Sequence, residues 1–115
     1  MDKQLQTRQI TPELINYITE KIVQAIRPRQ IILFGLYARG EMTASSDIDL
    51  FIIQDGQISN RDMRRQIERL LWGRHFGLDL IVRTPAEVAR NLADGNPFYT
   101  RHIFDEGKVL YERPT

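Results

Sequence analysis

Three short runs rich in branched apolar residues limit the folds open to this chain more than any other feature. They occupy residues 31–34, 47–53 and 78–82. Apolar runs of this length, each flanked by a glycine or a turn pair, are typical of buried strands. Segments with helical spacing of apolar residues lie around them, at 11–27, 59–72 and 84–95. Helices that alternate with strands predict a small α/β layer structure.

The helix boundaries carry recognisable signals. Thr11-Pro12 and Thr84-Pro85 each offer a capping hydroxyl followed by a proline suited to the first helical position. Pro28 ends the first helix. Asn96-Pro97 is expected to begin a further short helix, and residues 108–111 form a possible edge strand. The order of elements leaves the strand directions open, since the connection over residues 36–46 is near the lower limit for a parallel crossover.

The size and composition predict one domain over residues 1–115, with residues 1–10 as a loosely ordered tail. The net charge of +1 does not favour direct binding to nucleic acid or to a membrane surface. The absence of cysteine excludes disulfides, thiolate metal sites and a cysteine nucleophile. No signal peptide and no bilayer-length apolar stretch are visible, so we expect a cytoplasmic protein.

Three aspartates are the candidate chemical centre. Asp47 and Asp49 are two residues apart at the start of a predicted strand, so their side chains share one face. Asp79 alternates with leucines on the next strand, and the three carboxylates converge if these strands are neighbours. Clustered carboxylates repel one another, and a divalent cation removes that repulsion. Oxygen ligands favour Mg²⁺ or Mn²⁺, which could support an in-line displacement at phosphate.

A glycine-containing loop between Gly35 and Gly40 follows the first strand. Its backbone N–H groups could cradle phosphates. The spacing of these glycines is that of a P-loop, but Glu41-Met42 replaces the lysine and hydroxyl residue that a P-loop requires, so we reject that reading. Each of these features alone is more typical of a turn or a cap than of a site. Their order and spacing together favour a site.

Residues 33–53 resemble the minimal nucleotidyltransferases of the DNA polymerase β superfamily, of the antitoxin type. The family pattern is Gly-Ser, ten residues, then Asp-x-Asp, and Gly35-Leu36 followed by Asp47-Ile48-Asp49 has that spacing. The segments Ala38-Arg39-Gly40 and Ser46–Leu50 also match. Asp79 corresponds to the third family carboxylate, and the similarity extends to the ending Glu106–Tyr111.

The resemblance implies a nucleotidyltransferase fold, with a small mixed sheet of three core strands flanked by helices. It implies that Asp47, Asp49 and Asp79 bind Mg²⁺ or Mn²⁺, with Asp79 also helping to deprotonate the attacking hydroxyl. Gly35 and the next residue would hold the triphosphate of ATP, while Arg39, beside Gly40, supports that loop or reaches a phosphate. Such small members pair with HEPN-domain toxins, and some are thought to transfer AMP to a toxin tyrosine.

The family serine is replaced here by Leu36, which cannot donate a hydrogen bond to phosphate. Losing one bond to a charged group weakens binding by about 1.5–3 kcal/mol. We therefore keep open an active enzyme, a degenerate module that neutralises a toxin by binding alone, and transfer to a small molecule or nucleic acid. Tyr37 is a candidate source of a substitute hydroxyl. The acceptor, the nucleotide and the oligomeric state, whether homodimer or hetero-oligomer, are not fixed by the sequence.

Other residues receive structural interpretations. The arginines of residues 61–74 are interpreted as a solvated face, with an acidic partner or nucleic acid as the alternative. Trp72 and Phe76 are expected to cap the core. The apolar residues of 98–104 are expected to pack in the core, with a partner surface as the alternative. His75 and His102 belong to no metal motif and are read as structural.

Overall fold

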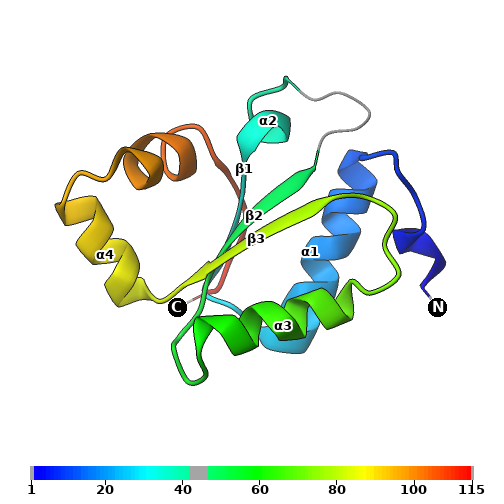
Figure 1. Ribbon diagram of the computed structural model, residues 1–115, viewed down its shortest axis with the longest axis horizontal. Coiled ribbons are helices and arrows are strands. Elements are labelled where there is room, and N and C mark those ends of the chain that lie inside the picture. The colour runs from blue at the N-terminus through cyan, green and yellow to red at the C-terminus, as the bar shows by residue number, and fades with distance from the viewer. Residues whose placement is uncertain (1, 42–46, 115) are drawn as a thin grey trace.

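The computed structural model describes residues 2–41 and 47–114, which form a four-stranded mixed sheet with helices on both faces (Figure 1). The strands are β1 Gln30–Phe34, β2 Ile48–Ile53, β3 Leu78–Arg83 and β4 Lys108–Glu112. Their order is β3-β2-β1-β4. β2 is antiparallel to β1 and parallel to β3, and β4 is antiparallel to β1. The mixed sheet and its edge strand confirm the predicted fold class.

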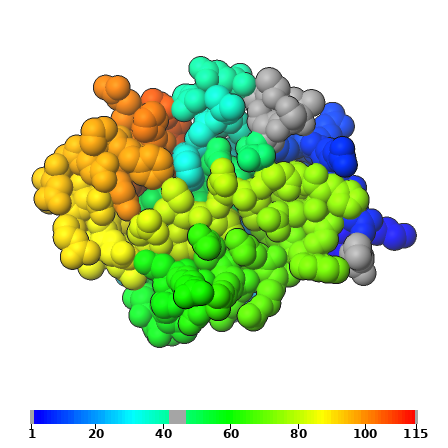
Figure 2. All heavy atoms as spheres, in the orientation of Figure 1, coloured from blue at the N-terminus to red at the C-terminus, as the bar shows by residue number. Residues whose placement is uncertain are grey.

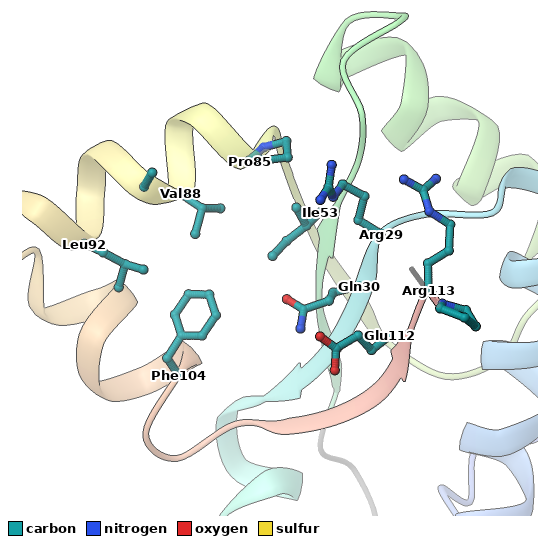
Figure 3. Close-up of a pocket in the computed structure, with 11 residues that line it drawn as sticks. Arg29, Gln30, Ile53, Pro85, Val88, Leu92, Phe104, Glu112 and Arg113 are labelled. Atoms are coloured by element: carbon teal, nitrogen blue, oxygen red, sulfur yellow. The ribbon is translucent and has the colours of Figure 1, made fainter.

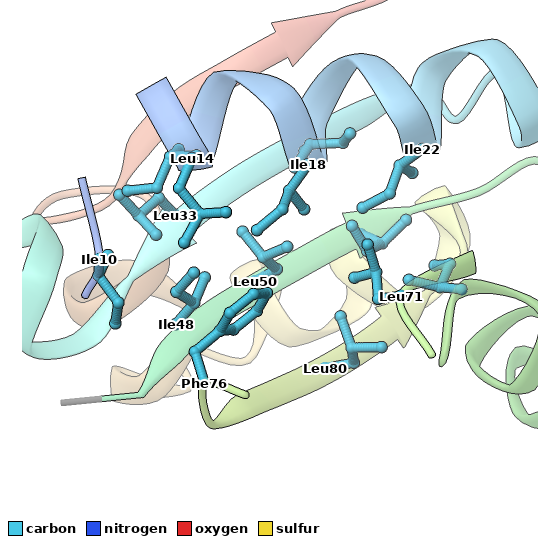
Figure 4. Packing of buried hydrophobic residues seen from close by; sticks show 14 of the residues in the cluster. Ile10, Leu14, Ile18, Ile22, Leu33, Ile48, Leu50, Leu71, Phe76 and Leu80 are labelled. Atoms are coloured by element: carbon cyan, nitrogen blue, oxygen red, sulfur yellow. The ribbon is translucent and has the colours of Figure 1, made fainter. Parts of the chain in front are cut away.

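The helices divide between the two faces of the sheet. They are α1 Pro12–Ile26, α2 Gly35–Ala38, α3 Asn60–Leu70, α4 Pro85–Ala93 and the π-helix η2 Phe98–Ile103. Side chains of α1 and α3 bury one sheet face together with Ile48, Leu50 and Ile52 of β2, as Figure 4 shows for the side beneath α1. The alternate residues Phe51 and Ile53 face α4 and η2. The strand period of two therefore produces two cores.

Local sequence explains where the main helices begin. The Thr11 hydroxyl accepts a hydrogen bond from the amide of Leu14, and Pro12 occupies the first position of α1. Thr84 forms a capping box with Glu87 at the start of α4. Arg27 adopts left-handed φ directly after α1, which ends the helix before Pro28. The predicted starts of these helices are thus confirmed by their caps.

The structure departs from the sequence-based expectations in three places. Leu5 and Ile10 are buried in the larger core, although residues 1–10 were expected to form a loosely ordered tail. The polar connection after β1 contains the short helix α2, which apolar periodicity could not reveal because it spans four residues. Trp72 does not cap the core, since it is 69% exposed, whereas Phe76 is buried as expected.

The outer face of α3 is rich in arginine. Arg61, Arg64, Arg65 and Arg69 are exposed, and α3 lies on the visible side of the molecule in Figure 2. The exposure agrees with a solvated face, and Arg64 approaches Glu68 within 4.0 Å one helical turn away. No helix in the described part of the chain combines the length and the apolar character needed to cross a bilayer.

Candidate active site

The sheet register places two of the three predicted aspartates side by side on adjacent strands. β2 and β3 are parallel, and Asp49 is the register partner of Asp79. Paired residues on adjacent strands point to the same sheet face, which here is the face covered by α4 and η2. Asp47 lies one residue before β2 and is exposed. The predicted convergence of these side chains at one end of the sheet is therefore what the structure shows.

Two glycines make room for the carboxylates. A Cβ atom built on Gly35 would lie 2.1 Å from Oδ2 of Asp49, and one built on Gly77 would lie 1.8 Å from Oδ1 of Asp47. Any larger residue at either position would have to displace a carboxylate. Gly77 was visible in the sequence only as turn punctuation. Gly77 directly precedes β3, which carries Asp79. A glycine in that position is the sequence signal that could have indicated that it makes room for a carboxylate.

The neighbouring carboxylates change the protonation of Asp49. The pKa of Asp49 is raised from 3.8 to about 6, first by partial burial and then by a hydrogen bond and charge repulsion from Asp79. Repulsion from Asp47 adds to the increase, and the positive charge of Arg39 opposes it. When protonated, the Asp49 carboxyl donates to the Asp79 carboxylate. The site therefore favours either a proton or another positive charge between these groups.

We expect Asp49→Asn to make the metal-free protein more stable at pH 8 and to leave its stability at pH 4 nearly unchanged. Because the folded-state pKa lies above the unfolded value, the native state retains a proton that the unfolded state loses, and stability falls as pH rises from about 4 to 6. After discounting for solvent exposure, the gain at pH 8 is about 1 kcal/mol, or a few degrees in melting temperature.

Thermal unfolding in a chelating buffer at both pH values measures this difference. Asp94→Asn, at an exposed helix end, is the matched control and should show no comparable gain at pH 8. Equal stability of Asp49→Asn and wild type at pH 8 would contradict the raised pKa.

The donor set fits a hard divalent cation in its chemistry. Three carboxylates supply only oxygen ligands, which Mg²⁺ and Mn²⁺ prefer, and Mg²⁺ completes its shell with water and phosphate oxygens. In the described ranges no group of three acidic or histidine side chains already encloses a metal position. The carboxyls of Asp49 and Asp79 are instead hydrogen-bonded to each other. A cation would replace the proton that they share.

The predicted phosphate loop lies next to the carboxylates. Gly35 begins α2 with φ of +78° and touches Asp49, and Leu36 is 42% exposed at the position of the family serine. Tyr37 packs against the core cluster of the opposite sheet face, which argues against its replacing the missing hydroxyl. Gly40 has φ of +74° and no described atom within 4 Å of a built Cβ.

Arg39 is held by glutamates from two parts of the chain. Its Nε donates to Oε2 of Glu41 at 3.3 Å, and its Nη1 lies 3.6 Å from Oε2 of Glu106. Sequence reasoning noted Glu106 as part of the family-like ending and gave it no function. Met42 and Ser46, on which the P-loop comparison and part of the motif rested, lie outside the described residues.

A separate cavity lies away from these residues. It has a volume of about 460 Å³, with Ile53 and Val88 in its wall and Arg29 and Arg113 at its edge (Figure 3). Arg29 lies before β1 and Ile53 ends β2, so the cavity is at the opposite end of the sheet from Asp49. Both guanidinium groups pair with Asp55. We base the candidate site on the carboxylates, because their chemistry is specific and this cavity has none comparable.

Comparison with solved structures defines the class of fold. A putative nucleotidyltransferase from Sulfolobus solfataricus superposes with a TM-score of 0.60 and 22% identity, over 88% of this chain and 79% of that chain. A structure described as a toxin-antitoxin with AMP-PNP superposes with a TM-score of 0.54 and 18% identity, over 85% of this chain and 73% of that one. The architecture is a nucleotidyltransferase fold.

The sequence comparisons then give the family. The model of the family described as polymerase beta, nucleotidyltransferase matches residues 16–115. A putative protein adenylyltransferase of Methanocaldococcus jannaschii is 31% identical over 99 residues, which cover 86% of this chain and 92% of that protein. The chain belongs to the polymerase beta nucleotidyltransferase family.

Proposed function

We propose that this protein is a Mg²⁺-dependent nucleotidyltransferase that transfers AMP from ATP to a hydroxyl group of a partner protein. The observation that carries the proposal is the convergence of Asp47, Asp49 and Asp79 beside the glycine that begins α2. The similarity to a relative named as a protein adenylyltransferase supports AMP as the transferred group and a protein as the acceptor.

Each residue has a distinct part in this reaction. Asp47, Asp49 and Asp79 would hold the cation, which when bound neutralises phosphate charge. Asp79, exposed at the start of β3, takes the proton of the acceptor hydroxyl. The acceptor oxygen forms a bond to the α-phosphorus, the bond to the bridging oxygen breaks, and pyrophosphate leaves. The backbone of Gly35 and Leu36 and the guanidinium of Arg39 orient the triphosphate.

A toxin is the acceptor that we propose, with the HEPN class implied by the family resemblance. The structural neighbour described as a toxin-antitoxin with AMP-PNP supports both a nucleotide and a toxin as binding partners. The most direct test of the transfer is incubation of the protein with α-labelled ATP, Mg²⁺ and a co-encoded HEPN protein. Label on a tyrosine of the partner is expected. A folded partner that remains unlabelled, while the nucleotide binds, would contradict protein adenylylation.

A binding-only antitoxin is the second candidate, and Leu36 favours it. In that case the Asp47→Asn, Asp49→Asn variant still protects cells from the toxin, because contact alone neutralises it. Loss of protection by the folded variant favours the enzyme. Transfer to a small molecule or a nucleic acid would instead appear as label on those acceptors in a screen without the toxin.

We expect Leu36→Ser to bind Mg²⁺-ATP about ten- to a hundredfold more tightly than wild type. The serine hydroxyl restores a hydrogen bond to a charged phosphate oxygen, which contributes about 1.5–3 kcal/mol. Leu36 is 42% exposed and belongs to neither core cluster, so its replacement should leave the fold intact. Calorimetric titration measures the difference, with Leu92→Ser as an exposed leucine control.

The absolute affinities then separate the two candidates. Tight binding by wild type, with little gain in Leu36→Ser, would show that the backbone alone holds the triphosphate and would contradict the expected role of the serine. Binding by the serine variant alone would favour the degenerate module.

A further inference from the structure

The turn before β4 brings a charged contact to the proposed phosphate site from a distant part of the sequence.

 The contact is the ion pair between Nη1 of Arg39 and Oε2 of Glu106, at 3.6 Å. In Figure 1 the turn between η2 and β4 passes beside α2, which agrees with this contact. The side chains are partly buried, with 32% of Arg39 and 29% of Glu106 exposed.

The backbone around Glu106 is fixed on both sides. The amide of Glu106 donates to the carbonyl of Arg101 at 2.9 Å, in the i to i−5 pattern of the π-helical turn. The amide of Gly107 donates to the carbonyl of Ile103 at 3.2 Å, and a Cβ built on Gly107 would lie 2.8 Å from Cγ2 of Ile32 in β1. The glutamate is therefore carried by a turn that is tied to η2 and packed on the sheet. Single π-turns occur frequently at functional sites.

Arg39 faces two opposing attractions. One is the carboxylate of Asp49, whose negative charge attracts the guanidinium. The other is the pair of glutamates, Glu41 and Glu106, that contact its Nε and Nη1. A guanidinium that closed over Asp49 would neutralise a proposed metal ligand. The contacts found in residues 2–41 and 47–114 leave Nη2 of Arg39 without a partner, and this nitrogen can donate to a phosphate oxygen.

We propose that Glu106 is a positioning residue that holds Arg39 in the orientation in which it binds the triphosphate, and away from the metal-binding carboxylates. This inference rests on the proposed function, because it assumes that nucleotide binds beside Asp49. His102 also contacts Glu106, with its Nδ1 3.6 Å from the same oxygen, and its ring packs against Phe98. This second contact further limits the movement of the Glu106 carboxylate.

The proposal predicts a change in nucleotide affinity that is opposite in sign to the change expected from net charge alone. Removing a negative charge near a site for an anionic nucleotide should strengthen binding or leave it unchanged. If Glu106 positions Arg39, Glu106→Gln instead weakens binding, by about two- to fivefold for a partly exposed ion pair. Asp105→Asn is the matched control, because it removes the charge of the adjacent exposed residue.

The experiment is a titration of Mg²⁺ with α,β-methylene ATP, which cannot release pyrophosphate, into the full chain and four variants. These are Glu106→Gln, Asp105→Asn, Arg39→Ala and the double variant Arg39→Ala, Glu106→Gln. We expect weaker binding by Glu106→Gln, none of this loss in Asp105→Asn, and no further loss when Glu106→Gln is added to Arg39→Ala. Thermal unfolding confirms that each variant is folded.

The outcomes separate the inference from the function on which it rests. Wild-type binding together with unchanged or tighter binding by Glu106→Gln overturns the positioning role alone. An equal loss in the presence and absence of Arg39 also overturns it, because Glu106 would then act independently. Failure of wild type to bind the analogue overturns the proposed nucleotide site itself.

Discussion

Replacement of Asp47 and Asp49 together by asparagine is expected to reduce nucleotide transfer by at least about a hundredfold while the fold is retained. Asparagine preserves shape and keeps one oxygen, but it removes the two negative charges that would hold the cation. Stabilisation of transition-state charge by a bound metal contributes several kcal/mol, which corresponds to a loss of this size or larger. The measurement is the rate of label transfer from α-labelled ATP at saturating Mg²⁺.

The surroundings of the two aspartates indicate that the variant folds. Asp47 is exposed and Asp49 is partly exposed, and the apolar residues Ile48 and Leu50 that alternate with them remain in the core. The control is Asp94→Asn with Asp105→Asn, which removes the same total charge from exposed positions elsewhere. Transfer at an undiminished rate by the folded Asp47, Asp49 variant would show that these carboxylates are not the metal ligands.

Gly35→Ala should have the second largest effect, acting on both stability and activity. Gly35 has φ of +78°, and an added Cβ would lie 2.1 Å from Oδ2 of Asp49. The left-handed backbone alone destabilises an alanine by about 1–2 kcal/mol. The added carbon must also displace the carboxylate of Asp49, and a displacement of about 1 Å in a reacting site can reduce the rate by about a hundredfold.

Gly40→Ala separates the cost of the left-handed backbone from the displacement of Asp49. Gly40 has φ of +74°, close to that of Gly35, but no described atom lies within 4 Å of its built Cβ. We therefore expect Gly40→Ala to lower the melting temperature and to leave transfer, measured well below that temperature, nearly unchanged. Similar activity losses in both variants would mean that contact between Gly35 and Asp49 is not what limits the geometry of the site.

Much of the fold follows from local sequence. The apolar runs of β1, β2 and β3 and the threonine–proline starts of α1 and α4 have direct local causes in side-chain alternation and capping. The shared face of Asp47 and Asp49 follows from the strand period in the same way. The pairing of Asp49 with Asp79 was conditional on β2 and β3 being neighbours, which depends on the packing of α3 across the sheet.

Other features depend on contacts between distant segments. No local pattern specifies the antiparallel direction of β2 against β1. Leu5 lies in a polar segment and is buried by the tertiary fold, whereas Trp72 lies just after the end of α3 and remains exposed. The contact between Arg39 and Glu106 joins residues far apart in sequence. Spacing rules describe neighbours along an element and could not reveal it.

A crystal structure of the protein with Mn²⁺ and α,β-methylene ATP tests the central claim most directly, through the anomalous signal of the metal. The account predicts manganese in contact with carboxylate oxygens of Asp47, Asp49 and Asp79, at about 2.0–2.2 Å, and with phosphate oxygens of the nucleotide. Nucleotide bound at another place, or manganese with no contact to these three side chains, would contradict it.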